Sequence, residues 1–205
     1  MRSWSGWKAR PCRAWRRWRD DLTLVYLAGP DVFLPDAPDW LARKKAICAG
    51  HGLTGVSPLD PLAEEPAAWA EVPDWRRIAL RNEAHIRGCV AVIANLTPFR
   101  GPSADAGTVY EVGFARGLGL RVFGYATVTA GFLDRTLAAF PGSRDGDAWR
   151  DQDGLLVEQF GLFDNLMIEG ALAETGGLVR EDADRWRDLS VFERCVVAAA
   201  EILAG

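Results

Sequence analysis

Two carboxylates in the middle of the chain, Asp105 and Glu111, have the type and spacing that best suit chemistry. Asp105 ends a polar loop rich in Gly and Pro, and Glu111 lies in the first turn of a helix predicted from Thr108 to Leu118. The positive end of the helix dipole favours an ionised carboxylate there. Two converging carboxylates can supply a nucleophile for an anomeric carbon and a second group that orients or protonates the substrate. Spacing alone leaves open that Asp105 only caps the helix and that Glu111 is a solvated residue complementing the dipole.

Alternating strands and helices are expected to position these carboxylates. Short apolar runs predict buried strands at 24–28, 53–57, 89–94 and 121–125. Helical spacing predicts helices at 40–49, 75–87, 108–118 and 190–204. This alternation predicts an α/β fold with a parallel sheet between helices. Ligands of such sheets bind at the carboxyl ends of strands, so we expect the site in the loops after Ala28 and Ala94. Residues 127–161 have a weaker pattern and are expected to form a surface excursion, a candidate lid.

The composition is that of a cytoplasmic globular protein. A chain of 205 residues fits one domain with a sizeable core, and no apolar run is long enough to span a bilayer. Its four cysteines are scattered, which favours reduced thiols. Neither His51 nor His85 has a partner at the spacing of zinc sites, so we expect no metal.

The first 19 residues differ sharply from the rest of the chain. They hold seven basic side chains and no acidic one, and subtracting these seven from the net charge of −4 leaves about −11 for the remainder. We interpret residues 1–21 as a basic, Trp-rich extension without fixed structure and residues 22–205 as a single domain. An acidic body is a poor match for a nucleic-acid backbone, so neither nucleic acid nor a membrane is the expected partner. Binding of either by the extension is the less favoured alternative.

Three segments of the chain resemble nucleoside 2-deoxyribosyltransferases and stand in the order of that family: Val25–Phe33, Ile93–Gly113 and Phe163–Ile168. The similarity covers roughly residues 22 to 170, and the central segment is the most specific. It implies a flavodoxin-like, doubly wound parallel sheet in a three-layer α/β/α arrangement. It also implies transfer of 2-deoxyribose between nucleobases by double displacement with retention, without a cofactor and with water as a competing acceptor.

The resemblance also assigns catalytic roles. Glu111 matches the nucleophile, Asp105 matches the carboxylate that binds the sugar 5′-hydroxyl, and Tyr26 matches a tyrosine that positions the nucleophile. The general acid of the family falls near Asn82 or Glu83, with a register uncertain by one residue. If Asn82 takes that place, the leaving base must be protonated differently, by hydrogen bonding or through a neighbouring group.

Further matched residues imply a substrate pocket shared between subunits. Phe33 and Phe99 are expected to stack on the base, with Arg100 and Gly101 shaping their loop and Gly29 close to the substrate. Asn165 and Met167 match residues that reach in from a neighbouring subunit. The partners implied are a 2′-deoxynucleoside, a free nucleobase and further copies of the chain, as a dimer or a multiple of dimers.

Two other functions remain as alternatives. A related N-hydrolase cleaves 2′-deoxynucleoside 5′-monophosphates but carries a serine near the position of Asp105. A carboxylate would accept a hydrogen bond from a neutral 5′-hydroxyl and repel a phosphate, so Asp105 favours nucleosides. A non-catalytic nucleotide-sensing module is the second alternative, because fold alone does not decide function. Convergence of Asp105, Glu111, Tyr26 and Asn165 on one site favours an enzyme over it.

Overall fold

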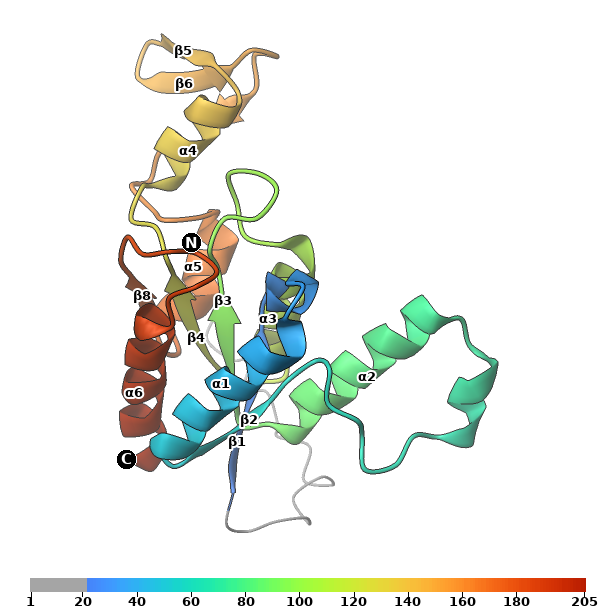
Figure 1. Ribbon diagram of the computed structural model, residues 1–205. Coiled ribbons are helices and arrows are strands. Elements are labelled where there is room, and N and C mark those ends of the chain that lie inside the picture. Colours follow the sequence, from blue (N-terminus) through green and yellow to red (C-terminus); the bar gives the residue numbers. More distant parts are fainter. Residues whose placement is uncertain (1–21) are drawn as a thin grey trace, which may run out of the picture.

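The computed structural model describes residues 22–205, and the extension predicted at 1–21 lies outside the described residues. Its centre is a five-stranded parallel sheet with the order β2-β1-β3-β4-β8 (Figure 1). The strands are β1 (Thr23–Ala28), β2 (Leu53–Val56), β3 (Ala91–Asn95), β4 (Arg121–Ala126) and β8 (Leu178–Arg180). The predicted α/β fold is confirmed, although β3 begins at Ala91 and β8 was not predicted.

Helices cover both faces of the sheet because its strands are apolar on both sides. Helices α1 (Ala37–Gly50) and α6 (Ser190–Ala204) pack on one face. Helices α2 (Asp74–Gly88), α3 (Ala106–Gly117) and α5 (Leu166–Ala173) pack on the other. Successive side chains of a strand point to opposite faces, so Val25 and Leu27 join the α1 side whereas Tyr26 joins the α3 side. The alternation in β1 thus brings Tyr26 to the helix that carries Glu111.

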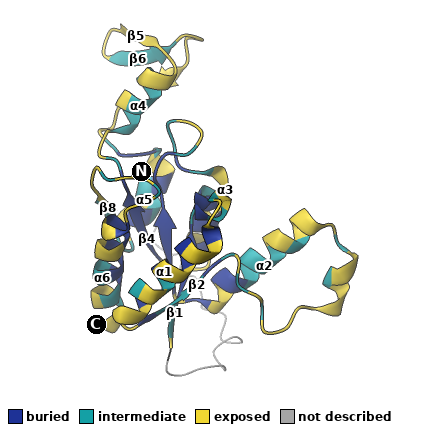
Figure 2. Cartoon of the chain, in the orientation of Figure 1, coloured by how far each residue is buried: buried dark blue, intermediate teal, exposed yellow. Residues whose placement is uncertain are grey.

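Helix α2 contacts the sheet mainly through its C-terminal half. Of its residues only His85 and Ile86 are buried, and its exposed start extends from the body together with the 3-10 helix Ala67–Glu71 (Figure 2). The half of α2 that contains Asn82 is therefore the part anchored near the sheet.

The predicted excursion has a secondary structure of its own. Helix α4 (Phe132–Ala139) leads into an antiparallel sheet of β5 (Gly142–Asp145), β6 (Ala148–Asp151) and β7 (Leu156–Val157). We call residues 132–157 the arm, which extends from the carboxyl edge of the central sheet (Figure 1). Its regular structure was missed because every residue of β5 is exposed, so the strand lacks the apolar alternation that marks a half-buried strand.

Candidate active site

Glu111 is held on α3 with its carboxylate against β1 and α2. The Tyr26 hydroxyl donates a hydrogen bond of 2.6 Å to Glu111 Oε1, and Asn82 Nδ2 donates one of 3.3 Å to the same oxygen. Tyr26 is fully buried and Glu111 is 8% exposed. Because α3 begins at Ala106 rather than at the predicted Thr108, Glu111 lies in the second turn. The helix dipole acts mainly within the first turn, so these hydrogen bonds replace it as the chief support of the carboxylate.

Burial sets the acidity of this carboxyl group. It raises the pKa of Glu111 from 4.5 to about 7, and the Tyr26 hydrogen bond opposes that rise. The charge of Asp105 raises the pKa further, and the Asn82 amide lowers it. The pKa of Tyr26 lies far above its usual value, through burial and the nearby Glu111, so the phenol keeps its proton and acts as a donor. Glu111 is consequently about half ionised near pH 7, a balance common among catalytic groups.

Asp105 caps α3, as the simpler reading of its position predicted. Its Oδ2 accepts hydrogen bonds from the Thr108 backbone N at 3.0 Å and from Thr108 Oγ1 at 3.1 Å. Both bonds go to one carboxylate oxygen. The cap fixes Asp105 where its charge acts on Glu111, so capping and a role in the site are compatible.

The structure distinguishes the two candidates on α2. Asn82 contacts Glu111, whereas Glu83 accepts a hydrogen bond of 2.6 Å from the exposed Tyr110 hydroxyl and lies 3.9 Å from Arg87. Glu83 therefore belongs to the surface between α2 and α3. Asn82 Oδ1 is buried and has no hydrogen-bond partner within residues 22–205. The group beside Glu111 is thus an amide, which has no acidic proton to give.

The two expected base-stacking rings come together from different loops. Phe33 ends the 3-10 helix Pro30–Phe33 after β1, Phe99 follows β3, and their rings stack at 5.5 Å with an interplanar angle of 10°. The Arg100 guanidinium lies 5.2 Å from one ring centroid and 4.6 Å from the other. Arg100 is the one non-glycine residue in the described part with a positive φ, at 55°, which marks a strained turn. Trp186 meets the edge of Phe99 at 6.3 Å, a neighbour that the sequence did not indicate.

Two matched glycines differ in how tightly they are packed. A Cβ on Gly29 would lie 2.3 Å from Asp31 Oδ2 and 2.8 Å from Asn95 Cβ, so only glycine fits there. A Cβ on Gly101 would meet nothing within 4 Å. Gly29 is therefore required for close approach, whereas packing does not demand a glycine at 101.

Neither Asn165 nor Met167 makes a hydrogen bond with Glu111 in the same chain. Asn165 caps α5, accepting from Met167 N at 3.0 Å and donating to Glu158 at 2.6 Å. Met167 is 74% exposed. Both line a largely apolar groove of about 910 Å³ between α3 and α5. Within one chain they are not part of the cluster around Glu111.

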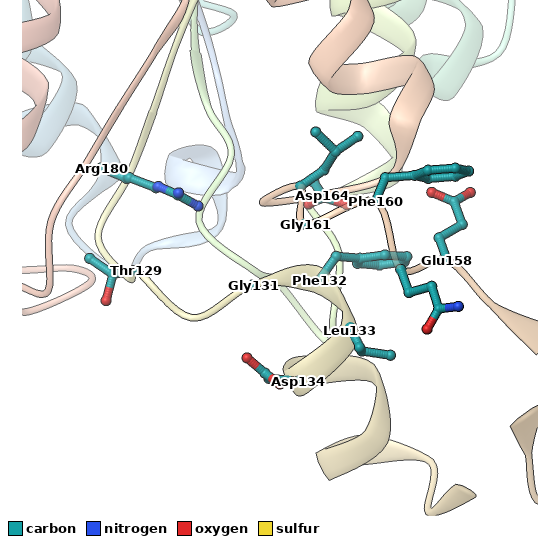
Figure 3. A pocket seen from close by; sticks show the side chains of 12 residues that line it. Thr129, Gly131, Phe132, Leu133, Asp134, Glu158, Phe160, Gly161, Asp164 and Arg180 are labelled. Carbon is teal, nitrogen blue, oxygen red and sulfur yellow. The ribbon is translucent and has the colours of Figure 1, made fainter. Parts of the chain in front are cut away.

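A second cleft, of about 410 Å³, lies where the arm joins the body (Figure 3). Phe132 and Phe160 extend into it from α4 and from the segment before α5, and Arg180 lies on the opposite side. None of the predicted site residues lines this cleft. No three His, Cys, Asp or Glu side chains in the described part gather as metal ligands. Across residues 22–205, no helix is long and apolar enough to cross a membrane.

Comparison with known proteins decides the family. The family model described as nucleoside 2-deoxyribosyltransferase matches residues 25–167. The chain belongs to this family. The match runs from β1 to the first turn of α5, so it contains every candidate residue from Tyr26 to Met167 and leaves out β8 and α6. Family members act on nucleosides and nucleobases, in glycosyl transfer or N-glycosidic cleavage.

One protein and two solved structures are similar to this chain. An uncharacterized protein of Schizosaccharomyces pombe is 32% identical over 173 residues, which cover 77% of this chain and 81% of the relative. The 2-desoxiribosyltransferase of Leishmania mexicana has 28% identity and a TM-score of 0.55, covering 85% of this chain and 97% of its own. A conserved protein from Enterococcus faecalis, with 21% identity and a TM-score of 0.50, covers 78% of this chain and 92% of its own and shares the fold.

Proposed function

We propose that the protein transfers 2-deoxyribose between nucleobases through a covalent glycosyl intermediate on Glu111. The observation that carries this proposal is a buried carboxylate whose pKa is about 7 and which a tyrosine holds in place. Both hydrogen bonds reach Oε1, which leaves Oε2 as the oxygen for attack. A glutamate with only a packing role would have no need of this arrangement, whereas a buried nucleophile does.

The exchange proceeds in two displacements. Glu111 Oε2 attacks C1′ of the deoxynucleoside, the C1′–N bond breaks, and the base departs with the bonding electron pair. A nitrogen lone pair of the second base then attacks C1′, the bond to Glu111 breaks and releases the carboxylate, and the incoming base loses its N–H proton to solvent. Two inversions give net retention. Tyr26 keeps its hydrogen bond to Oε1 throughout and so limits the carboxylate to the rotamer that points at the sugar.

Asp105 and Asn82 define the rest of the catalytic group. We assign the 5′-hydroxyl of the sugar to Asp105, whose charge would oppose a 5′-phosphate. This supports nucleosides as substrates over nucleoside monophosphates. Because an amide cannot act as an acid, Asn82 assists the leaving base by hydrogen bonding, and the proton reaches the base from solvent. Glu83 has no part in this mechanism.

The remaining residues bind the base and complete the pocket. Phe33, Phe99 and Arg100 provide a stacked surface at the carboxyl edge of the sheet, beside Gly29 and Gly101. Asn165 and Met167 serve a neighbouring subunit, a role supported by the exposure of Met167 and by the groove that both residues line. We therefore propose a homo-oligomer without a cofactor that works in nucleoside salvage in the cytoplasm.

One incubation tests the function. The full-length protein is mixed with a deoxynucleoside, with and without a second free base, and the products are separated. A new nucleoside supports the proposal, and free deoxyribose indicates a hydrolase. If neither product forms, the assignment is overturned. Glu111→Ala should abolish both products while the fold is kept. Turnover of the deoxynucleoside 5′-monophosphate above that of the deoxynucleoside would favour the related N-hydrolase instead.

A further inference from the structure

Lys44 is a buried cation that the proposed chemistry does not use. It lies in α1 with 0% exposure, and its Nζ is 3.2 Å from Asp31 Oδ2. The ammonium also faces the rings of Phe192 at 4.7 Å and Tyr125 at 5.4 Å. Burying a charge is costly, and a well-packed apolar pair is often at least as stable as a buried ion pair. Stability is therefore a weak explanation for Lys44, and the surroundings of its partner Asp31 offer a better one.

The Asp31 carboxylate connects two loops that leave neighbouring strands. It accepts from Trp40 Nε1 at 2.8 Å and from Asn95 Nδ2 at 3.2 Å. Asp31 follows β1 in the chain, whereas Asn95 is the last residue of β3. Asn95 Oδ1 accepts from Thr97 N at 3.1 Å, which fixes the start of the second loop. One carboxylate thus determines how the segment 29–33 lies against the segment 95–99.

The same two segments carry the stacked rings. Phe33 comes two residues after Asp31, and Phe99 comes four residues after Asn95. The approach between the loops is close, because a Cβ on Gly29 would collide with both Asp31 and Asn95. A shift of the Asp31 carboxylate would therefore separate the loops and change the ring spacing of 5.5 Å.

We propose that Asp31, fixed by Lys44, is a positioning residue for base binding. It touches no substrate and acts through Asn95 and Phe33 on the stacked surface. This inference rests on the proposed function only in taking that surface as the place where the nucleobase binds. Loss of the Asp31 contacts should raise KM for the acceptor base and leave kcat at saturating base nearly unchanged, because Glu111 and Tyr26 belong to a separate set of contacts.

The main variant is the double substitution Asp31→Leu with Lys44→Met in the full-length chain. It removes both charges and keeps similar side-chain volumes, so neither charge is left buried without its partner. The thermal midpoint should fall, because Trp40 Nε1 and Asn95 Nδ2 lose their acceptor, but the variant should remain folded. KM for the base should rise about three- to tenfold, the scale of one aromatic stacking contact. An unchanged KM in this folded double variant overturns the proposal.

A double-mutant cycle with Phe33→Ala separates positioning from a merely structural role. Phe33→Ala alone should raise KM by a similar factor. Added to the Asp31 and Lys44 substitutions, it should raise KM little further, because both changes act through the same ring. If the two factors multiply, Asp31 does not act through Phe33 and the proposal fails.

Asn95→Ala provides a test that needs neither the double variant nor an active enzyme. It removes the link between the loops, together with the hydrogen bond from Thr97 N inside the second loop, and leaves the contacts of Asp31 with Lys44 and Trp40 in place. The segment that decides the test is 29–34, because residues 95–101 also lose the Thr97 hydrogen bond. Amide hydrogen exchange at residues 29–34 should become faster, with β1 and β3 as slow as in the wild type. Unchanged exchange at residues 29–34 overturns the proposal. A wild type that forms no new nucleoside overturns the proposed function instead, since hydrogen exchange is measured without substrate.

Discussion

Replacing Tyr26 by Phe removes one hydroxyl that donates a 2.6 Å hydrogen bond to Glu111 and keeps the buried ring. The hydrogen bond stabilises the ionised carboxylate, so its loss raises the pKa of Glu111 above the present value of about 7. A hydrogen bond to a charged group contributes about 1.5–3 kcal/mol, which corresponds to a rise of roughly one to two pH units. Because Glu111 is 8% exposed, little solvent screening reduces this figure.

In the proposed mechanism the ionised form of Glu111 is the nucleophile, and this sets the direction of the effect on activity. Activity falls as pH drops through the pKa of Glu111, so a higher pKa moves the acidic limb of the profile to higher pH. At pH 7 the ionised fraction would decline from about one half to roughly one tenth or one hundredth, a loss of about five- to fiftyfold. Well above both pKa values the variant should recover most of the wild-type rate.

The assay is the initial rate of base exchange across a pH series, with kcat/KM fitted at each pH. Tyr110→Phe is the matched control, because the exposed Tyr110 precedes Glu111 on α3 but donates its hydrogen bond to Glu83. Its profile should coincide with that of the wild type. A Tyr26→Phe profile that is lowered equally at every pH, with an unmoved acidic limb, would refute the electrostatic reasoning and leave only a steric role for Tyr26.

Three further substitutions test the same site. Glu111→Gln should stabilise the fold by about 3 kcal/mol at alkaline pH, because the raised pKa of Glu111 costs stability as pH rises from 4.5 through 7, and the difference should vanish toward pH 4.5. Urea unfolding at both ends of this range measures it, and equal stabilities would contradict the burial argument. Asn82→Asp places a second carboxyl group beside Glu111 and should add an alkaline limb to the pH profile of kcat/KM. An unchanged profile would show that the side chain at position 82 takes no part in the reaction. Asp105→Asn keeps a capping oxygen but removes the charge that raises the pKa of Glu111, so the acidic limb should move to lower pH. The preference for deoxynucleosides over their 5′-monophosphates should also weaken. An unaltered preference in competition assays would show that Asp105 does not recognise the 5′-hydroxyl.

The sequence predicts those parts of the fold that local pattern determines. The runs 24–28 and 89–94 are continuous and apolar, so their strands were recognised, whereas β8 has only three residues, too few for a pattern. The start of α3 was placed two residues late because the capping role of Asp105 was left open.

The site depended on contacts between distant segments, which local pattern does not encode. Tyr26 and Glu111 are 85 residues apart, and only the resemblance to the family associated them before the structure did. A shift of one residue on α2 separates Asn82 from Glu83, and packing against α3 decides which of them faces inward. Lys44 stands between Arg43 and Lys45 and looks like part of a solvated helix face in the sequence. Its burial depends on Phe192 of α6, which lies 148 residues later in the chain.

The central claim is that Glu111 becomes covalently linked to the sugar. The most direct measurement is mass spectrometry of the protein quenched in acid during reaction with a deoxynucleoside and no acceptor base, followed by digestion. The account predicts a deoxyribosyl group on the peptide that contains Glu111, lost when a free base is added before the quench and absent from Glu111→Gln. Rapid base exchange by a protein whose Glu111 peptide never carries the sugar, or an adduct on another residue, would contradict it.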